Sequence, residues 1–190
     1  MPSEPKPRSI AAPSAPVLPD RIILTGFMGS GKTTTGALLA THLGWRFLDL
    51  DHEIERLHHR SVPQIFAESG ELHFRHLESS TLASLLHEHH IVLALGGGAP
   101  EELANRLLLK QTPNTAVVYL SAPFATLLHR CTLQAADPSA TLRPNLADPA
   151  AAERRFHLRH TLYASIASHT LDTSNLSPNQ TPLAILDLLL

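Results

Sequence analysis

The chain has 190 residues, with 15 Lys and Arg against 17 Asp and Glu, and a single cysteine, Cys131. The length suits one domain, and the nearly balanced charge gives no electrostatic reason to expect nucleic acid or an acidic membrane as a partner. The lone cysteine and the absence of an apolar run of roughly 20 residues predict a cytoplasmic protein outside the membrane.

The first segment, residues 1–19, is rich in proline and is predicted to be a disordered leader. It holds six of the 15 prolines, and such a composition buries too little apolar surface to offset chain entropy. It also lacks the continuous apolar stretch of an export signal. Residues 20–190 are predicted to form the single folded domain.

Short apolar runs alternate with longer helical patterns from Arg21 onward. Runs too apolar to alternate suit strands that are covered on both faces, which indicates a parallel sheet between helices. The predicted strands are 22–24, 46–50, 91–95, 116–120 and 169–171. The predicted helices are 32–43, 51–59, 71–90, 101–109, 149–168 and 182–190. The expected class is α/β, with a parallel five-stranded sheet and helices on both faces.

Residues 26–33, GFMGSGKT, match the phosphate-binding pattern G-x-x-x-x-G-K-[ST] between a predicted strand and a predicted helix. Glycines let backbone N–H groups face an anion, the helix N-terminus adds partial positive charge, and Lys32 adds a full one. The alternative is a plain glycine-rich turn, which both flanks disfavour. The predicted phosphate contacts are Gly29, Ser30, Gly31, Lys32, Thr33 and Thr34. The Thr33 hydroxyl is expected on Mg²⁺.

Two carboxylates, Asp49 and Asp51, end the second predicted strand. Side chains at i and i+2 of a strand face the same way, and this edge of an open α/β sheet binds ligands. We expect Asp49 to hold Mg²⁺ through water and Asp51 to orient an acceptor hydroxyl. The alternative is that either acid, Asp51 in particular, only caps the following helix.

Taken together, the motifs resemble the shikimate kinase family in their order along the chain. They are GFMGSGKTTTG at 26–36, FLDLD at 47–51, Ile65-Phe66 with G-E-x-x-F-R-x-x-E at 70–78, LGGGA at 95–99, Arg143-Pro144, and R-x-x-x-Y at 159–163. The resemblance covers about Arg21 to the C-terminus. It implies a P-loop NTPase-type fold with a mobile lid at about 132–148, and a monomer. It also implies ATP as co-substrate, Mg²⁺ as cofactor, and phosphorylation of the shikimate 3-hydroxyl in the aromatic amino acid (chorismate) pathway.

The same resemblance implies that Arg75 and Arg159 clamp the shikimate carboxylate from two helices. It also implies that Gly97 and Gly98 line the acceptor site through backbone N–H groups. Glu78 follows Arg75 by three residues and can fix the guanidinium group, whose planar fork suits a carboxylate. The alternatives are solvated helix-face charges for the arginines and a plain turn for the glycines.

The stretch between residues 135 and 149 has no apolar period, and loops of this length are usually lids or disordered. The resemblance assigns Arg130, which ends a helical stretch, to adenine and phosphate contact, and Arg143 to phosphate contact on lid closure. Asn145 stands where the family usually has leucine. The interval between the two arginines is longer than in compact members, with the extra residues expected at 134–140. Solvated loop charges are the alternative.

The resulting hypothesis gives the catalytic roles to Lys32, Asp51 and Arg143, which act through in-line positioning and electrostatics. Two other functions stay open. A kinase of a related small metabolite such as gluconate is less compatible with the arginine pair and the triple glycine. A non-catalytic nucleotide-binding regulator is less compatible with the intact P-loop lysine, carboxylates and arginines.

Overall fold

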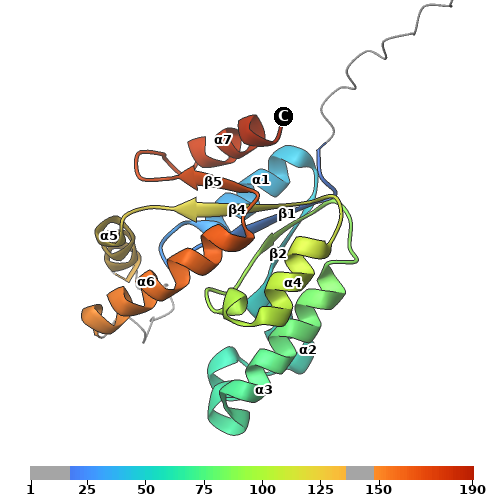
Figure 1. Ribbon diagram of the computed structural model, residues 1–190, viewed down its shortest axis with the longest axis vertical. Helices are drawn as coiled ribbons and strands as arrows, with labels where there is room; N and C mark the ends of the chain where they lie inside the picture. Colours follow the sequence, from blue (N-terminus) through green and yellow to red (C-terminus); the bar gives the residue numbers. More distant parts are fainter. Residues whose placement is uncertain (1–17, 136–147) are drawn as a thin grey trace, which may run out of the picture.

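The computed structural model describes residues 18–135 and 148–190. Its centre is a five-stranded sheet in the order β2-β3-β1-β4-β5, with every neighbouring pair parallel. The strands are β1 (Arg21–Thr25), β2 (Arg46–Asp49), β3 (Ile91–Ala94), β4 (Thr115–Ser121) and β5 (His169–Asp172). The helices are α1 (Lys32–Leu43), α2 (Leu50–His58), α3 (Val62–Leu85), the 3-10 helix η1 (Ala99–Glu101), α4 (Leu103–Gln111), α5 (Phe124–Ala135), α6 (Pro149–Ile166) and α7 (Gln180–Leu189). The predicted α/β class and parallel five-stranded sheet are confirmed (Figure 1).

Helices cover both faces of the sheet because side chains alternate along each strand. Ile22 and Leu24 of β1 pack with Leu39 of α1 and Ile185 of α7. Ile23, between them, packs on the opposite face in a larger core with side chains of α2, α3, α4 and the end of α6. The continuous apolar runs in the sequence are therefore explained by burial on both sides.

The connections that follow β1 and β3 run to opposite sides of the strand order, which creates a crevice at the carboxyl ends of these two strands. From β1 the chain runs through α1 to β2, beyond β3, whereas from β3 it runs through α4 to β4, on the other side of β1. Open α/β sheets bind ligands at such a switch point. The backbone N–H of Leu95 donates to the carbonyl oxygen of Leu24 at 3.0 Å. The loops that follow β1 and β3 therefore lie side by side.

Helix α3 differs most from its prediction. It starts at Val62 rather than at residue 71, with a capping box between Ser61 and Gln64. Gly70, in its middle, has φ 79° and ψ 172°, so two helical segments meet at a kink. The predicted start was wrong because this glycine interrupts the apolar period. The helix also ends at Leu85, before the turn into β3.

Helix α5 continues to Ala135, so Arg130 does not end a helical stretch as predicted. Residues 132–135, which were expected to be the first residues of the lid, belong to this helix. Residues 136–147 of the predicted lid, Arg143 included, and residues 1–17 of the predicted leader lie outside the described residues. Within the described ranges, none of the helices has the length and hydropathy needed to cross a membrane.

Candidate active site

The phosphate-binding loop joins β1 to α1 at the carboxyl edge of the sheet (Figure 1). Its glycines Gly26, Gly29 and Gly31 have φ values of 146°, 78° and 89°, which L side chains rarely adopt. A Cβ atom on Gly26 would lie 2.6 Å from the carbonyl oxygen of Leu120, and one on Gly29 2.5 Å from that of Leu127. Backbone conformation and close packing against β4 and α5 therefore both require glycine.

Lys32, the first residue of α1, places its ammonium group against this loop. Its Nζ atom donates to the carbonyl oxygens of Gly26 at 2.8 Å and Phe27 at 3.1 Å. The buried hydroxyl of Ser30 lacks a hydrogen-bond partner among the described residues. A buried polar atom without a partner is rare, and here it stands beside a helix N-terminus that attracts anions. The loop, the helix and the lysine together form a site for phosphate.

Thr33 and Asp49 bring two oxygen ligands together beside the loop. The Thr33 hydroxyl donates to Oδ2 of Asp49 at 3.1 Å. The Oδ1 atom of Asp49 accepts the backbone N–H of Asp51 at 3.2 Å and caps α2. The cap is therefore Asp49, and the alternative that Asp51 serves only as a cap is wrong. A hydroxyl and a carboxylate are the hard oxygen ligands that suit Mg²⁺.

Asp51, in the first turn of α2, faces the loop that follows β3. A Cβ atom on Gly96 would lie 2.7 Å from Oδ1 of Asp51 and 3.1 Å from Oε1 of Glu78. Burial raises the pKa of Asp51 to about 6, with Asp49 adding to the rise and Lys32 opposing it. A carboxyl group with this pKa is mostly ionised at neutral pH and can accept a hydrogen bond or a proton from a hydroxyl group.

Arg75, on α3, lies among three carboxylates and against the third glycine of the same loop. It donates to Glu78 at 2.8 Å and to Glu71 at 3.1 Å, and it lies 3.5 Å from Glu101. Burial lowers the pKa of Arg75, but the carboxylates outweigh burial and the pKa is raised. A Cβ atom on Gly98 would lie only 2.6 Å from its Nη2 atom.

Arg159 and Tyr163, one turn apart on α6, lie against the second glycine. Arg159 donates from Nε to Oε1 of Glu101 at 2.8 Å and from Nη2 to Oε2 at 3.3 Å. The Tyr163 hydroxyl donates to the carbonyl oxygen of Gly97 at 2.7 Å. A Cβ atom on Gly97 would lie 3.6 Å both from Nη1 of Arg159 and from the Tyr163 oxygen. The tyrosine thus fixes the loop that the arginine faces.

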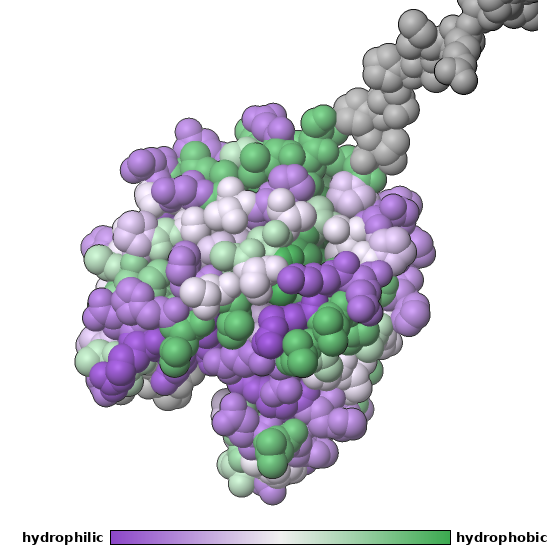
Figure 2. All heavy atoms as spheres, viewed as in Figure 1, coloured by the Kyte–Doolittle hydropathy of each residue, from purple (hydrophilic) through white to green (hydrophobic). Residues whose placement is uncertain are grey.

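The three side chains predicted to bind the acceptor therefore converge on one loop. Asp51, Arg159 and Arg75 face residues 96, 97 and 98 in turn, and they come from α2, α6 and α3. Figure 2 shows hydrophilic side chains gathered between α3, α4 and α6, with the surface notched between α3 and α6. The result is a polar hollow with a carboxylate on one side and two guanidinium groups on the other.

A cavity of about 340 Å³ adjoins the phosphate-binding loop on the other side. Arg130 lies in it and donates to the hydroxyl and carbonyl oxygens of Thr173 at 3.0 and 2.5 Å, respectively. The cavity runs from the loop to the segment after β5. It is lined by Gly29, Ser30, Gly31, Thr34, Thr35, Arg130, Leu133, Gln134, Thr173, Leu176, Pro178 and Thr181.

Two contributors to these sites were missed by sequence reasoning. Glu101 binds Arg159, and Thr173 binds Arg130, across 58 and 43 residues of chain, respectively. The one signal in the sequence for Glu101 was its position, three residues after the triple glycine. Nothing in the sequence around Thr173 identifies it.

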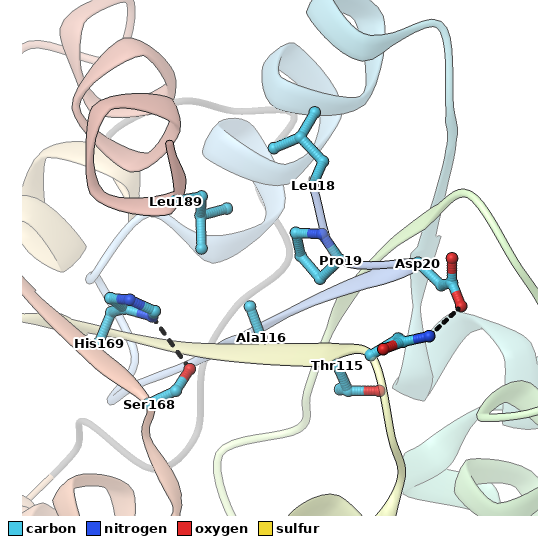
Figure 3. Close-up of a pocket in the computed structure, with 9 residues that line it drawn as sticks. Leu18, Pro19, Asp20, Thr115, Ala116, Ser168, His169 and Leu189 are labelled. Carbon is cyan, nitrogen blue, oxygen red and sulfur yellow. Dashed lines mark hydrogen bonds between the residues drawn. The ribbon is translucent and has the colours of Figure 1, made fainter. Parts of the chain in front are cut away.

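Figure 3 shows a third hollow, at the amino ends of the strands. Asp20 accepts a hydrogen bond from Asn114 at 3.3 Å, and Ser168 and His169 pair at 3.0 Å. None of the predicted site residues of the described ranges lines this hollow. The hollow is lined by Leu18, Pro19, Asp20, Asn114, Thr115, Ala116, Ser168, His169 and Leu189.

Comparison with known proteins identifies one family. A model of the family described as shikimate kinase matches residues 28–189. A shikimate kinase of Persephonella marina is 36% identical over 159 residues, which cover 84% of this chain and 92% of the relative. The solved structure of shikimate kinase from Acinetobacter baumannii in complex with shikimate has a TM-score of 0.78 and 38% identity, and the match covers 91% of this chain and 93% of that one. The predicted resemblance and the P-loop type of fold are both confirmed.

Some matches are more local. A shikimate kinase of Nitrosomonas europaea is 49% identical over 113 residues, which cover 60% of this chain and 53% of the relative. This chain therefore spans about half the length of that curated relative. The more complete matches to other members extend the similarity across both the phosphate-binding loop and the hollow around the triple glycine.

Proposed function

The chain belongs to the shikimate kinase family, and on this premise we propose that it transfers the γ-phosphoryl group of ATP to the 3-hydroxyl group of shikimate. The observation that carries the proposal is the convergence of Asp51, Arg75 and Arg159 on residues 96–98, beside the phosphate-binding loop. A cyclic polyhydroxy acid has hydroxyl groups for the carboxylate of Asp51 and a carboxylate for the two arginines. The Acinetobacter baumannii relative was solved with shikimate bound.

The nucleotide end of the reaction is assigned to the loop between β1 and α1. Backbone N–H groups of residues 29–34 hold the phosphates at the helix N-terminus. Lys32, now bonded to two loop carbonyl oxygens, turns its ammonium group toward the outer phosphates. Arg130 borders the nucleoside cavity. Arg143, which lies outside the described residues, is assigned to phosphate contact.

Mg²⁺ is part of this proposal, because the chain offers a donor set that fits it. The Thr33 hydroxyl would bind the ion directly and Asp49 would hold one of its water ligands, and the two side chains lie 3.1 Å apart. The ion, when bound, would supply positive charge to the phosphate oxygens. Thr33 and Asp49 themselves provide the fixed oxygen ligands that set its place.

At the acceptor end, Asp51 orients the hydroxyl group for in-line attack and accepts its proton as the phosphoryl group transfers. Arg75 and Arg159 fix the far end of the ring through its carboxylate. Gly97 and Gly98 are assigned to line the acceptor site through their backbone N–H groups, and Gly98 leaves room for the Arg75 guanidinium group because it has no side chain. Positioning of the reacting groups therefore supplies a large part of the rate acceleration.

The test is ADP release from ATP with purified protein and a panel of shikimate, quinate and gluconate. Turnover should require shikimate, and Asp51→Asn should lower kcat by about 100-fold or more. Asp187→Asn, which removes the same charge from an exposed position on α7, is the matched control. Turnover with gluconate but not with shikimate would overturn the proposal, and robust activity of Asp51→Asn would remove Asp51 from its role.

We further propose that the enzyme acts as a monomer in the cytoplasm. Within this chain Asp51, Arg75 and Arg159 already converge on one loop, and the single cysteine suits a reducing compartment. Sedimentation of the active protein across a range of concentrations tests the first statement. A dimer at the concentrations used for the assay would contradict it.

A further inference from the structure

Glu101 occupies the point where the two guanidinium groups of the acceptor hollow come together. Its Oε1 atom lies 2.8 Å from Nε of Arg159, and its Oε2 atom lies 3.3 Å from Nη2 of the same arginine. The same Oε2 atom lies 3.5 Å from Nη2 of Arg75. One carboxylate of the protein itself therefore bridges the arginine of α6 and the arginine of α3.

The donors that Glu101 uses are those that a bound carboxylate would need. A carboxylate binds guanidinium best through a pair of parallel N–H donors, and Glu101 takes such a pair from Arg159. On Arg75, Nη1 already donates to Glu78 and Nη2 to Glu71. A ligand carboxylate that bridges the two arginines thus meets the side chain of Glu101 in its place.

Charge and side-chain exposure indicate which of the three carboxylates a ligand carboxylate can displace. Two guanidinium groups face three carboxylates in this cluster, so a fourth carboxylate would enter a site whose positive charge is already matched. The Glu78 side chain is 1% exposed, whereas those of Glu101 and Glu71 are 37% and 64% exposed, and of these two only Glu101 contacts both arginines. Glu101 stands at the end of η1 and can turn into water, where a charged side chain loses little.

We propose that Glu101 is a resident carboxylate that holds the arginine pair in the free enzyme and is displaced by the carboxylate of the acceptor. It keeps Arg75 and Arg159 together when the hollow is empty, and its competition sets the affinity for the acidic substrate. Glu101 is thus a determinant of substrate affinity that touches the binding groups. This inference rests on the proposed function, because shikimate supplies the displacing carboxylate.

The test is Glu101→Gln, in which the amide oxygen can still accept from Arg159 but the competing charge is gone. Calorimetry in the presence of ADP should give a Kd for shikimate about two- to fivefold lower than in the wild type, the range expected for a partly exposed ion pair. Glu102→Gln removes the same charge from the next residue and should leave the Kd unchanged. Glu101→Ala is the second variant and should also bind more tightly.

A neutral analogue separates competition from simple repositioning. Shikimamide has a carboxamide in place of the carboxylate. It therefore has no negative charge that would compete with the charge of Glu101. Wild type and Glu101→Gln should bind it with the same affinity. Thermal unfolding of each variant, checked by circular dichroism, establishes that the folds compared are intact.

Each outcome bears on a different statement. An unchanged or weaker Kd for shikimate in both variants, or an equal gain for shikimamide, would overturn the competing role and make Glu101 a support of Arg159. Failure of the wild type itself to bind shikimate would overturn the proposed function, and this inference with it. Tighter shikimate binding confined to the charged ligand is the result expected.

Discussion

The glycines after β3 differ in what a side chain at each would meet, and this makes Gly98→Ala a sharp test of Arg75. Gly98 has φ −97° and ψ −13°, which alanine adopts freely. The new Cβ atom would nevertheless lie 2.6 Å from Nη2 and 2.7 Å from Nη1 of Arg75. Because those atoms end a flexible side chain, the fold should survive while the guanidinium group moves.

We expect Gly98→Ala to lower kcat/KM for shikimate by about 10- to 100-fold. Its free energy of unfolding should stay within about 1 kcal/mol of the wild type. Gly97→Ala is the matched control, since its Cβ atom would lie at an ordinary 3.6 Å from Arg159 and Tyr163, and its effect should be clearly smaller. Equal effects of the two substitutions would mean that displacement of Arg75 is not the cause.

Glu78 gives a pH dependence to stability. Burial raises its pKa from 4.5 to about 7, although Arg75 opposes the rise. A carboxyl group whose pKa is higher in the folded state stabilises the fold below the unfolded pKa, and this contribution is lost as pH rises through the folded pKa. Glu78→Gln removes this contribution to the free energy of unfolding, which in the wild type falls by up to about 3 kcal/mol between pH 4.5 and 7.

Urea unfolding from pH 4.5 to 8 measures this effect. Wild-type stability should fall more steeply with rising pH than that of Glu78→Gln, so that the two curves separate toward pH 8. Glu68→Gln, at an exposed position of the same helix, should follow the wild type. Parallel curves for wild type and Glu78→Gln would show that Glu78 ionises alike in the folded and unfolded chains.

At the residue scale, the sequence predicted the groups that a motif defines by spacing and missed those that folding brings in. Asp51 and Arg75 stand within short patterns whose residue types suit the chemistry. Glu101 does not, because its partner Arg159 lies 58 positions away, and an acid at the start of a predicted helix is expected to be solvated. The cap of α2 was left open between two acids, and backbone geometry assigns it to Asp49.

At the scale of elements, strands were predicted better than the helices that carry the site. A strand buried on both faces has a continuous apolar run that defines its place, as in β1 and β3. Helix α3 is interrupted by Gly70 in a conformation typical of glycine, so one helical period could not describe both its segments. The expected start at residue 71 was therefore wrong, and the helix also ends before the expected residue 90.

The junction of α5 with the segment after β5 makes Arg130 a test of the nucleotide cavity. Arg130 donates to both oxygens of Thr173 and borders the cavity beside the phosphate-binding loop. Arg130→Ala should raise the KM for ATP by about tenfold, because it loosens this wall and removes a positive charge. The KM for shikimate should change little, because the cavity beside Arg130 shares no lining residue with the groups that face residues 96–98.

Initial rates at varied ATP and fixed saturating shikimate, and then the reverse, measure the two constants. Arg154→Ala, which removes an exposed arginine of α6, is the control and should leave both unchanged. A rise in the KM for shikimate as large as that for ATP would contradict a role confined to the nucleotide. It would instead indicate that α5 supports the whole site.

At the scale of the molecule, the reversal of chain direction between β1 and β3 explains why two binding hollows meet. The nucleotide loop follows β1, and the acceptor loop follows β3, its neighbour in the sheet. Each hollow is completed by helices of its own: α5 and the segment before α7 for the nucleotide, and α2, α3 and α6 for the acceptor. In the proposed reaction, the phosphoryl group would therefore cross only the gap between two adjacent loops.

This division predicts separable stabilisation by the two ligands. A ligand at about 100 times its Kd stabilises the folded state by about 2.7 kcal/mol, which for a chain of this size raises Tm by about 5–10 °C. Mg²⁺-ADP and shikimate should each raise the Tm of the wild type. At the same ligand concentrations, Gly98→Ala should lose about half or more of the shift with shikimate alone, and Arg130→Ala about half of the shift with Mg²⁺-ADP alone. Loss of both shifts in either variant would contradict two hollows with separate walls, because one substitution would then have reached across β1 and β3.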